Sequence, residues 1–181
     1  AVLEAAGLTV FEVERLPTHG GSLRVYAQDA GGCRFPVARS VDLLRAEEAE
    51  LGLRTSSFYL GFQPRVNLIR DRLRSFLGDA RKEGQVVVGY GAAAKGNTLL
   101  NYAGVGPDLV RYVVDNNPVK QGHYLPGSHI PIVEERRIAE DNPDFVLILP
   151  WNLRDEIGHR LESLGGWSGA MVTAVPELII N

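Results

Sequence analysis

The stretch that decides the fold is Val86-Val87-Val88-Gly89-Tyr90-Gly91-Ala92-Ala93-Ala94-Lys95-Gly96-Asn97-Thr98. It opens with a continuous apolar run, which is typical of a strand buried on both faces of a parallel sheet. Two glycines then allow a tight turn, and a helical pattern follows from Gly96 to Tyr102. In this order of elements, backbone amides at the start of a helix are placed to hold a phosphate group.

The glycine spacing meets the dinucleotide-binding pattern at its first two glycines only, because Ala94 stands at the third position. Small side chains keep the surface of the turn low, and Lys95 adds a mobile positive charge. The alternative is that the glycines only connect strand to helix. The stretch predicts ligand contacts at Gly89, Tyr90, Gly91, Ala92, Ala93, Lys95, Asn97 and Thr98.

Outward from this stretch, strands and helices alternate along the chain. Apolar runs predict strands at 110–114, 145–149 and 170–175, with helices near 134–140 and 153–164. Upstream, an apolar stripe predicts a helix from about Arg65 to Lys82. Such alternation is the signature of βαβ units. We therefore expect an α/β, Rossmann-like, doubly wound and mainly parallel sheet with helices on both faces.

The first 53 residues differ from the rest. A short helix ends at Gly7, two strands at 8–15 and 23–27 form a hairpin, and an exposed helix is predicted over 42–53. In the second strand Leu23, Val25 and Ala27 alternate with Arg24 and Tyr26, the period of a half-buried strand. A hairpin with one helix buries little apolar surface on its own. We expect this part to lean on a partner surface, and to self-associate without one.

Composition narrows the class of protein. With 45% hydrophobic and 23% charged residues, the 181-residue chain is of globular type. A balance of 19 basic against 22 acidic residues argues against a nucleic-acid partner. No apolar run approaches the length of a membrane span, so no membrane partner is expected. The single cysteine, Cys33, predicts a reducing, cytoplasmic compartment.

Polar residues follow the strand that ends at Val114. Asp115 lies 24 residues after Gly91, near the place where an acid meets a ribose in dinucleotide-binding folds. The alternative is an Asx turn before Pro118, which we prefer for Asn117. Lys120 could bind the same diphosphate as Lys95 of the glycine turn. Candidate contacts here are Asp115, Asn116, Lys120 and Tyr124.

A further polar tip, Pro150-Trp151-Asn152, ends the strand at 145–149. In open α/β sheets ligands bind in a crevice beyond the carboxyl ends of the strands. If the strand at 145–149 neighbours 86–90, these residues lie over the same crevice as the glycine turn. Packing at a helix start is the alternative for Trp151. His123 and His129 are expected in exposed loops, and no metal site is predicted. No Ser-His-Asp or Cys-His set is found, so nucleophilic catalysis has no support in the sequence.

These motifs together resemble a known family. Its pattern is matched, in order, by Thr18-His19-Gly20-Gly21-Ser22-Leu23-Arg24, by 89–98, by 115–118 with 120–122 and 124–127, and by Leu149-Pro150-Trp151-Asn152. Over nearly the whole chain they are similar to the C-terminal domain of S-adenosylmethionine-dependent sugar C-methyltransferases, whose substrate is a nucleotide-linked sugar methylated at C3.

The resemblance implies a division of labour. In such enzymes an N-terminal module binds zinc, a central domain binds S-adenosylmethionine, and the Rossmann-like domain helps to hold a nucleotide-linked keto-deoxysugar. The enolate formed at C3, beside the C4 ketone, takes the methyl group. The family's zinc cysteines, methyl-donor loop and proton-abstracting motif have no counterpart here, so no cofactor is expected in this chain, which alone would be inactive. Residues 1–53 would end the methyltransferase domain, and 54–181 would form the substrate-binding domain.

By the same resemblance, the loop after the first strand of the hairpin lies near the sugar. The implied substrate contacts are His19, Gly20, Gly21, Ser22 and Arg24, with His19 near the active centre. A purely structural turn is the alternative. The glycine turn and Asp115 would also allow a stand-alone NAD(P)-dependent oxidoreductase or a coenzyme A or nucleotide-binding module, although no residues for hydride chemistry are evident.

Overall fold

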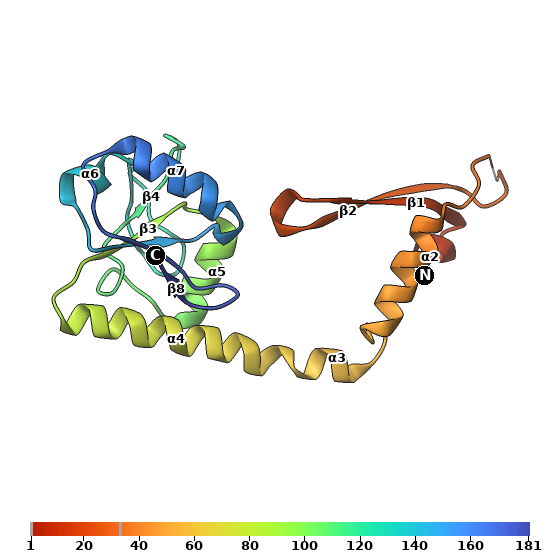
Figure 1. Ribbon diagram of the computed structural model, residues 1–181, viewed down its shortest axis with the longest axis horizontal. Coiled ribbons are helices and arrows are strands. Elements are labelled where there is room, and N and C mark those ends of the chain that lie inside the picture. Colours follow the sequence, from red (N-terminus) through yellow and green to blue (C-terminus); the bar gives the residue numbers. More distant parts are fainter. Residues whose placement is uncertain (1, 33) are drawn as a thin grey trace. The chain divides into compact units, whose positions relative to one another are not determined.

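A computed structural model describes residues 2–32 and 34–181, so that Cys33, on which the expected compartment depends, lies outside the described residues. The chain divides into two compact units, with the boundary between Gln63 and Pro64. Figure 1 shows the elements of each.

The first unit is an antiparallel hairpin with helices. The strands pair from Leu8 opposite Asp29 to Leu16 opposite Ser22, with an irregularity between Val10 and Glu12. The longest helix of this unit packs against the first strand. In chain order the elements are α1 (Val2–Ala5), β1 (Leu8–Leu16), η1 (Thr18–Gly20), β2 (Ser22–Asp29), α2 (Arg39–Glu50) and α3 (Ser56–Leu60).

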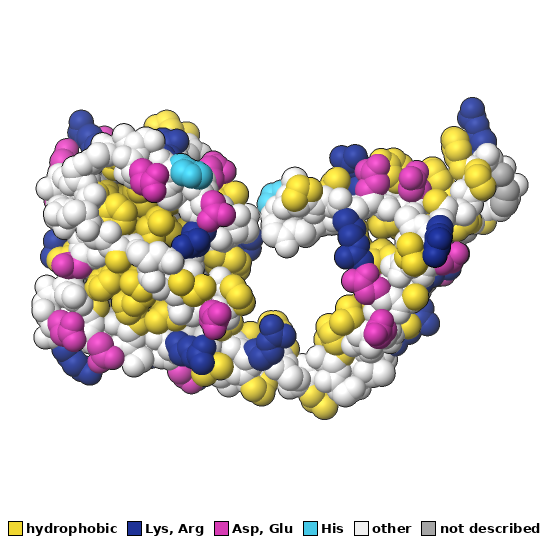
Figure 2. Space-filling view, in the orientation of Figure 1, with side chains coloured by type: hydrophobic (Ala, Val, Ile, Leu, Met, Phe, Trp, Pro, Cys, Tyr) yellow, Lys and Arg dark blue, Asp and Glu magenta, His cyan; other side chains and the backbone are white. Residues whose placement is uncertain are grey.

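Two expectations for this unit are corrected. Leu23 and Val25 are 46% and 45% exposed rather than facing a core, because α2 packs against β1 and leaves them uncovered. The better covered side chain is Tyr26, whose hydroxyl donates to Glu14 at 3.1 Å. Figure 2 shows hydrophobic side chains at the surface along the hairpin. Helix α2 starts before the predicted residue 42 and ends at 50, since Gly52 adopts a left-handed conformation, φ +72°.

The second unit contains a six-stranded sheet in the order β5-β4-β3-β6-β7-β8. All neighbours are parallel except β7 and β8. Its elements are α4 (Phe62–Lys82, which crosses the boundary), β3 (Val87–Tyr90), α5 (Ala94–Ala103), β4 (Val113–Val114), β5 (Ile132–Val133), α6 (Arg137–Asp141), β6 (Phe145–Ile148), η2 (Trp151–Leu153), α7 (Arg154–Leu164), β7 (Ala170–Thr173) and β8 (Ile179–Ile180).

The sequence missed two strands, and its predicted helix starts differ from the structure by one to three residues. Strands β5 and β8 have two residues each, too few to show a strand period. Helix α4 begins at Phe62 rather than Arg65, because a proline in the first helical turn, here Pro64, removes an amide that has no partner within the helix.

The core has two layers, one on each face of the sheet. Val87 and Leu147 join a cluster with Leu73 of α4 and Leu100 of α5. The alternate strand positions join a second cluster with α6 and α7, whose members include Val88, Ile148, Ile138 and Ile157. Alternation along a strand sends successive side chains to opposite faces. This α/β, mainly parallel arrangement is compatible with the Rossmann-like fold expected. No helix in the described part of the chain is long and apolar enough to span a bilayer.

Candidate functional site at the carboxyl edge of the sheet

The carboxyl ends of β3, β4 and β6 meet at one edge of the sheet. β3 lies between the other two, and Tyr90 pairs with Val114 on one side and Ile148 on the other. The chain crosses to β4 first and later returns on the far side of β3 to form β6. In open α/β sheets, ligands bind at such a reversal of strand order. The condition for placing Trp151 and Asn152 at this crevice, that the strand before Pro150 neighbours β3, is met.

Three glycines within and after β3 let neighbouring segments pack closely against the backbone. Gly91 has φ +86°, and a Cβ there would lie 2.7 Å from Pro150 Cδ. Gly89, expected to let the backbone approach a ligand, is instead a buried strand residue where a Cβ would lie 2.8 Å from Val113 Cγ2. The place of a third glycine is taken by Gly96, since a Cβ there would overlap Leu149. Helix α5 thereby lies directly against the end of β6.

Asp115 ties the turn after β3 to the loop after β4. Its Oδ2 accepts hydrogen bonds from the Ala92 amide and from Lys120 Nζ, both at 2.8 Å, while Oδ1 accepts one from the Asn117 amide at 2.9 Å. Burial raises the pKa of Asp115, but the hydrogen bonds from Lys120, Asn117 and Ala92 outweigh it and hold the pKa below 3.8. The sequence predicts a ribose contact for Asp115 and a diphosphate contact for Lys120. In the structure these two side chains bind each other.

The start of α5 is open by contrast. Its N-cap residue, Ala93, has no side-chain oxygen to cap the first amides. Lys95 Nζ lies 5.2 Å from the centre of the Trp151 ring and donates to Asn152 Oδ1 at 2.7 Å. Trp151 and Asn152 thus reach the glycine turn, as expected. Further along α5, Thr98 donates to the Ala94 carbonyl at 3.0 Å, a bond within the helix.

A hollow of about 240 Å³ opens at this edge beside the glycine turn. One wall is formed by four residues that sequence reasoning missed, the last residue of η2 and three residues of α7. They lie at i, i+3, i+4 and i+7, the spacing of one helix face, which was the available signal. These residues are Leu153, Glu156, Ile157 and Arg160, and the remaining lining is Tyr90, Gly91, Ala93, Asp115, Asn116 and Pro150.

A series of hydrogen bonds links Tyr90, Glu135 and Arg160 beside the hollow. The Tyr90 hydroxyl donates to Glu135, whose carboxylate also accepts from Arg160 Nε at 2.6 Å and Arg160 Nη2 at 2.8 Å. Burial and the hydrogen bond to Glu135 raise the pKa of Tyr90. Burial also raises the pKa of Glu135, but the bonds from Arg160 and Tyr90 bring it below its usual value. Tyr90 therefore stays protonated, and Arg160 is held in one orientation.

Residues 17–176 match the family model described as C-methyltransferase C-terminal domain. The chain belongs to this family. It is similar to C-methyltransferase NovU of Streptomyces niveus, with 34% identity over 176 residues, which are 97% of this chain and 42% of the relative. The chain therefore spans less than half the length of that relative. The family expected from the motifs is confirmed.

The structure places the remaining predicted contacts of this C-methyltransferase C-terminal domain within their own units. His19, with Gly20, Gly21, Ser22 and Arg24, belongs to the first unit. His19 has a left-handed backbone, φ 57°. Ser22 donates to the Thr18 carbonyl at 3.0 Å, and Arg24 pairs with Glu14 at 3.0 Å. Tyr124 is 64% exposed and forms an isolated bridge with Pro131.

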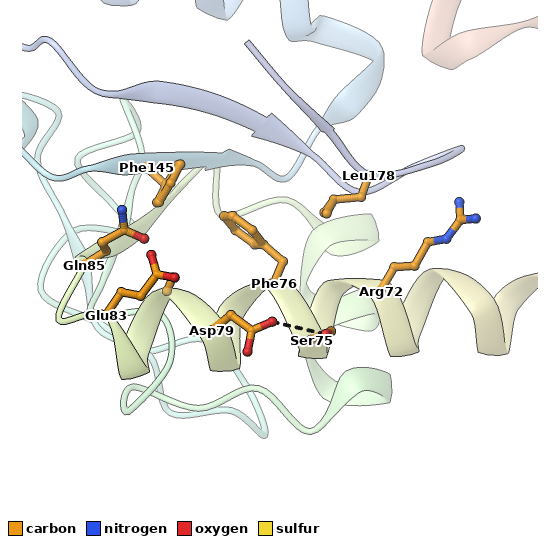
Figure 3. A pocket seen from close by; sticks show the side chains of 9 residues that line it. Arg72, Ser75, Phe76, Asp79, Glu83, Gln85, Phe145 and Leu178 are labelled. Atoms are coloured by element: carbon orange, nitrogen blue, oxygen red, sulfur yellow. Dashed lines mark hydrogen bonds between the residues drawn. The ribbon is translucent and has the colours of Figure 1, made fainter.

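A larger hollow of about 520 Å³ lies on one face of the sheet, between α4, Phe145 at the start of β6 and Leu178 before β8 (Figure 3). Phe76 and Phe145 meet there edge to face, with ring centres 5.0 Å apart. Its carboxylate Asp79 is exposed and pairs with Lys82 at 2.9 Å. Since ligand sites in this fold lie at the carboxyl ends of strands, the smaller hollow is the candidate site of the C-methyltransferase domain.

The described residues contain no group of three or more His, Cys, Asp or Glu placed to hold a metal ion. One position of the dinucleotide-binding pattern is already engaged within the protein. An acid at the end of the second strand binds the ribose in dinucleotide-binding folds. Here that acid, Asp115, is occupied by Ala92 and Lys120.

Proposed function

We propose that this chain is the nucleotide-sugar-binding part of an S-adenosylmethionine-dependent methyltransferase, which methylates C3 of a nucleotide-linked 4-keto-deoxysugar. Family membership supports the methyl transfer. The 42% share of the relative's length supports the idea that other parts of the enzyme supply the methyl donor, the zinc module and the base. The role of this chain would be to bind and orient the substrate.

The observation that carries the proposal is the open start of α5 at the reversal of strand order. Uncapped amides and the positive end of the helix dipole attract a phosphate group. Lys95 reaches the same place from the first turn, and its exposed ammonium is held by neutral partners, Trp151 and Asn152. Among residues 2–32 and 34–181 no carboxylate pairs with Lys95, so its ammonium can turn to an incoming diphosphate at low cost.

The main alternative, a stand-alone nicotinamide oxidoreductase, finds less support. Its ribose contact would require Asp115, whose carboxylate already binds Ala92, Asn117 and Lys120. A carboxylate accepts about four hydrogen bonds, so the two hydroxyls of a ribose could both bind only by breaking one of these bonds, worth about 1 kcal/mol or more. The same occupied carboxylate supports the proposal that S-adenosylmethionine binds elsewhere in the full-length enzyme.

The first unit would meet the rest of the enzyme. Leu23 and Val25 on the hairpin and Leu60 and Phe62 after it are exposed, with Leu60 75% exposed. Apolar side chains grouped in this way are typical of surfaces that a partner covers. The remainder of the methyltransferase is the partner we propose, with the His19 to Ser22 loop contacting the sugar.

Titration of the chain with thymidine diphosphate, followed by the fluorescence of Trp151, tests the proposal. Lys95→Ala should weaken binding about tenfold to a hundredfold, since a charge-assisted contact is lost. Lys82→Ala, which removes an exposed lysine of α4, is the matched control and should change nothing. Unchanged affinity in Lys95→Ala, with loss of binding in Arg24→Ala or Lys120→Ala, would place the diphosphate elsewhere.

A further inference from the structure

The charges around the 240 Å³ hollow are those of a site for an uncharged group. Two carboxylates, Asp115 and Glu156, line it, against a single cation, Arg160. That cation is already paired with Glu135 through both of the latter's oxygens, at 2.6 and 2.8 Å. A phosphate entering the hollow would meet Glu156 without a free positive charge to offset the repulsion.

The rest of the lining is largely apolar. Ile157 is buried, and with Leu153 and Pro150 it gives the hollow a nonpolar surface. At the rim, the Asn116 amide offers both hydrogen-bond donors and an acceptor, and it lies close enough to Tyr90 to affect its pKa. An apolar surface with a few convergent polar groups is typical of small-ligand sites, although 240 Å³ is smaller than most such sites and would hold only part of a ligand.

The Arg160 guanidinium adds a fixed planar surface. Glu135 holds it through two parallel bonds, and Glu135 is itself fixed by the Tyr90 hydroxyl. Planar guanidinium groups stack on aromatic rings, nucleobases included. A flat, uncharged group with polar edges matches the lining and the charge of the hollow.

We infer that the hollow binds the nucleoside of the nucleotide sugar, while the diphosphate lies outside it at Lys95. This inference rests on the proposed function, and it assigns the nucleoside and the diphosphate of the same ligand to two neighbouring positions. Asn116 pairs with the polar edge of the nucleoside, and Glu135 and Tyr90 act as positioning residues for Arg160. The negative rim directs the diphosphate away from the hollow, so that the nucleotide can enter in one orientation only.

The test compares thymidine diphosphate with inorganic pyrophosphate, which has the diphosphate charge and no nucleoside. Asn116→Ala should weaken thymidine diphosphate binding about threefold to tenfold and leave pyrophosphate binding unchanged. Lys95→Ala should weaken both. His159→Ala, next to Arg160 but outside the lining of the hollow, is the matched control and should change neither. Asn116 is exposed, so its replacement should leave the fold intact.

Two results would overturn the inference while the proposed function stands: thymidine diphosphate binding that depends on Lys95 but not on Asn116, or an Asn116→Ala variant that loses pyrophosphate binding equally. A wild-type chain that binds neither compound would overturn the proposed function, and the inference with it.

Discussion

The backbone amide of Ala92 donates a hydrogen bond to the Asp115 carboxylate at 2.8 Å, and this bond joins the turn after β3 to the loop after β4. The same oxygen holds Lys120 Nζ, which in turn donates to the Ala92 carbonyl at 3.1 Å. Both backbone groups of Ala92 are therefore satisfied by the neighbouring loop. Asp115, which the sequence predicts as a ligand contact, thus fixes the shape of the glycine turn.

Asp115→Asn should destabilise the second unit by about 1 to 3 kcal/mol at pH 7, because it leaves Lys120 without its carboxylate partner. The pKa of Asp115 is lowered in the folded state, so its stabilising contribution is full above the unfolded pKa, about 4, and disappears as the pH falls through the lower folded pKa. Urea unfolding should show the wild type losing its advantage over the variant as the pH is lowered from 7 to well below 4. Asp155→Asn, at a side chain 87% exposed, is the control. An equal advantage at both pH values would contradict this account.

Gly96→Ala should destabilise the protein by about 1 to 3 kcal/mol, since the added methyl would overlap Leu149 at the end of β6. Gly78→Ala is a matched control on α4, where a Cβ meets nothing within 4 Å. That control should stabilise the helix by up to about 1 kcal/mol. Urea unfolding measures both. A neutral Gly96→Ala would show that α5 can move away from the sheet.

S-adenosylmethionine should not bind to this chain, and no methyl transfer should be detectable with the chain alone. The reason is that the only acid placed as in a ribose-binding strand end, among the described residues, is engaged with Ala92 and Lys120. Isothermal titration calorimetry with S-adenosylmethionine measures this directly. Saturable binding in the micromolar range would show that the proposed division of labour is wrong.

The hairpin amides of β1 and β2 should exchange hydrogen much faster than those of β3. Two strands without a further neighbour are marginally stable, whereas Val87 to Tyr90 are buried between two strands and two helical layers. Hydrogen exchange followed by mass spectrometry gives the comparison. Sedimentation of Leu23→Glu should in addition show less self-association than the wild type. Equal protection in hairpin and sheet would mean that the hairpin is part of a stable core.

Much of the second unit was predictable because its pattern is local. The apolar runs that form β3 and β6 predict buried strands, and the apolar stripe through Leu73 and Phe76 predicts α4. Strand β5 could not be found, since two residues carry no period. It forms only because β4 is already there to pair with it.

The site was predictable in position but not in its contacts. Lys95, Trp151 and Asn152 were expected at one crevice and meet there. Glu135 could not be found, because its link to Tyr90 spans 45 residues and depends on where the loop after β5 falls. For Arg160 the helical spacing from Leu153 was visible, but which face of the helix turns to the crevice is decided by packing on the sheet.

The walls of the hollow come from segments far apart in the chain, the turn after β3 and the helix that follows β6. Only the pairing of β3 with β6 brings these segments together, so an unfolded chain has no such site. A ligand held there must favour the folded state by mass action, by about 2.7 kcal/mol at a concentration a hundred times its dissociation constant. If the ligand is the nucleotide sugar that we propose, its concentration would affect the lifetime of the protein as well as the reaction rate. A chain that holds this ligand unfolds, and so becomes accessible to proteases, less often than an empty one.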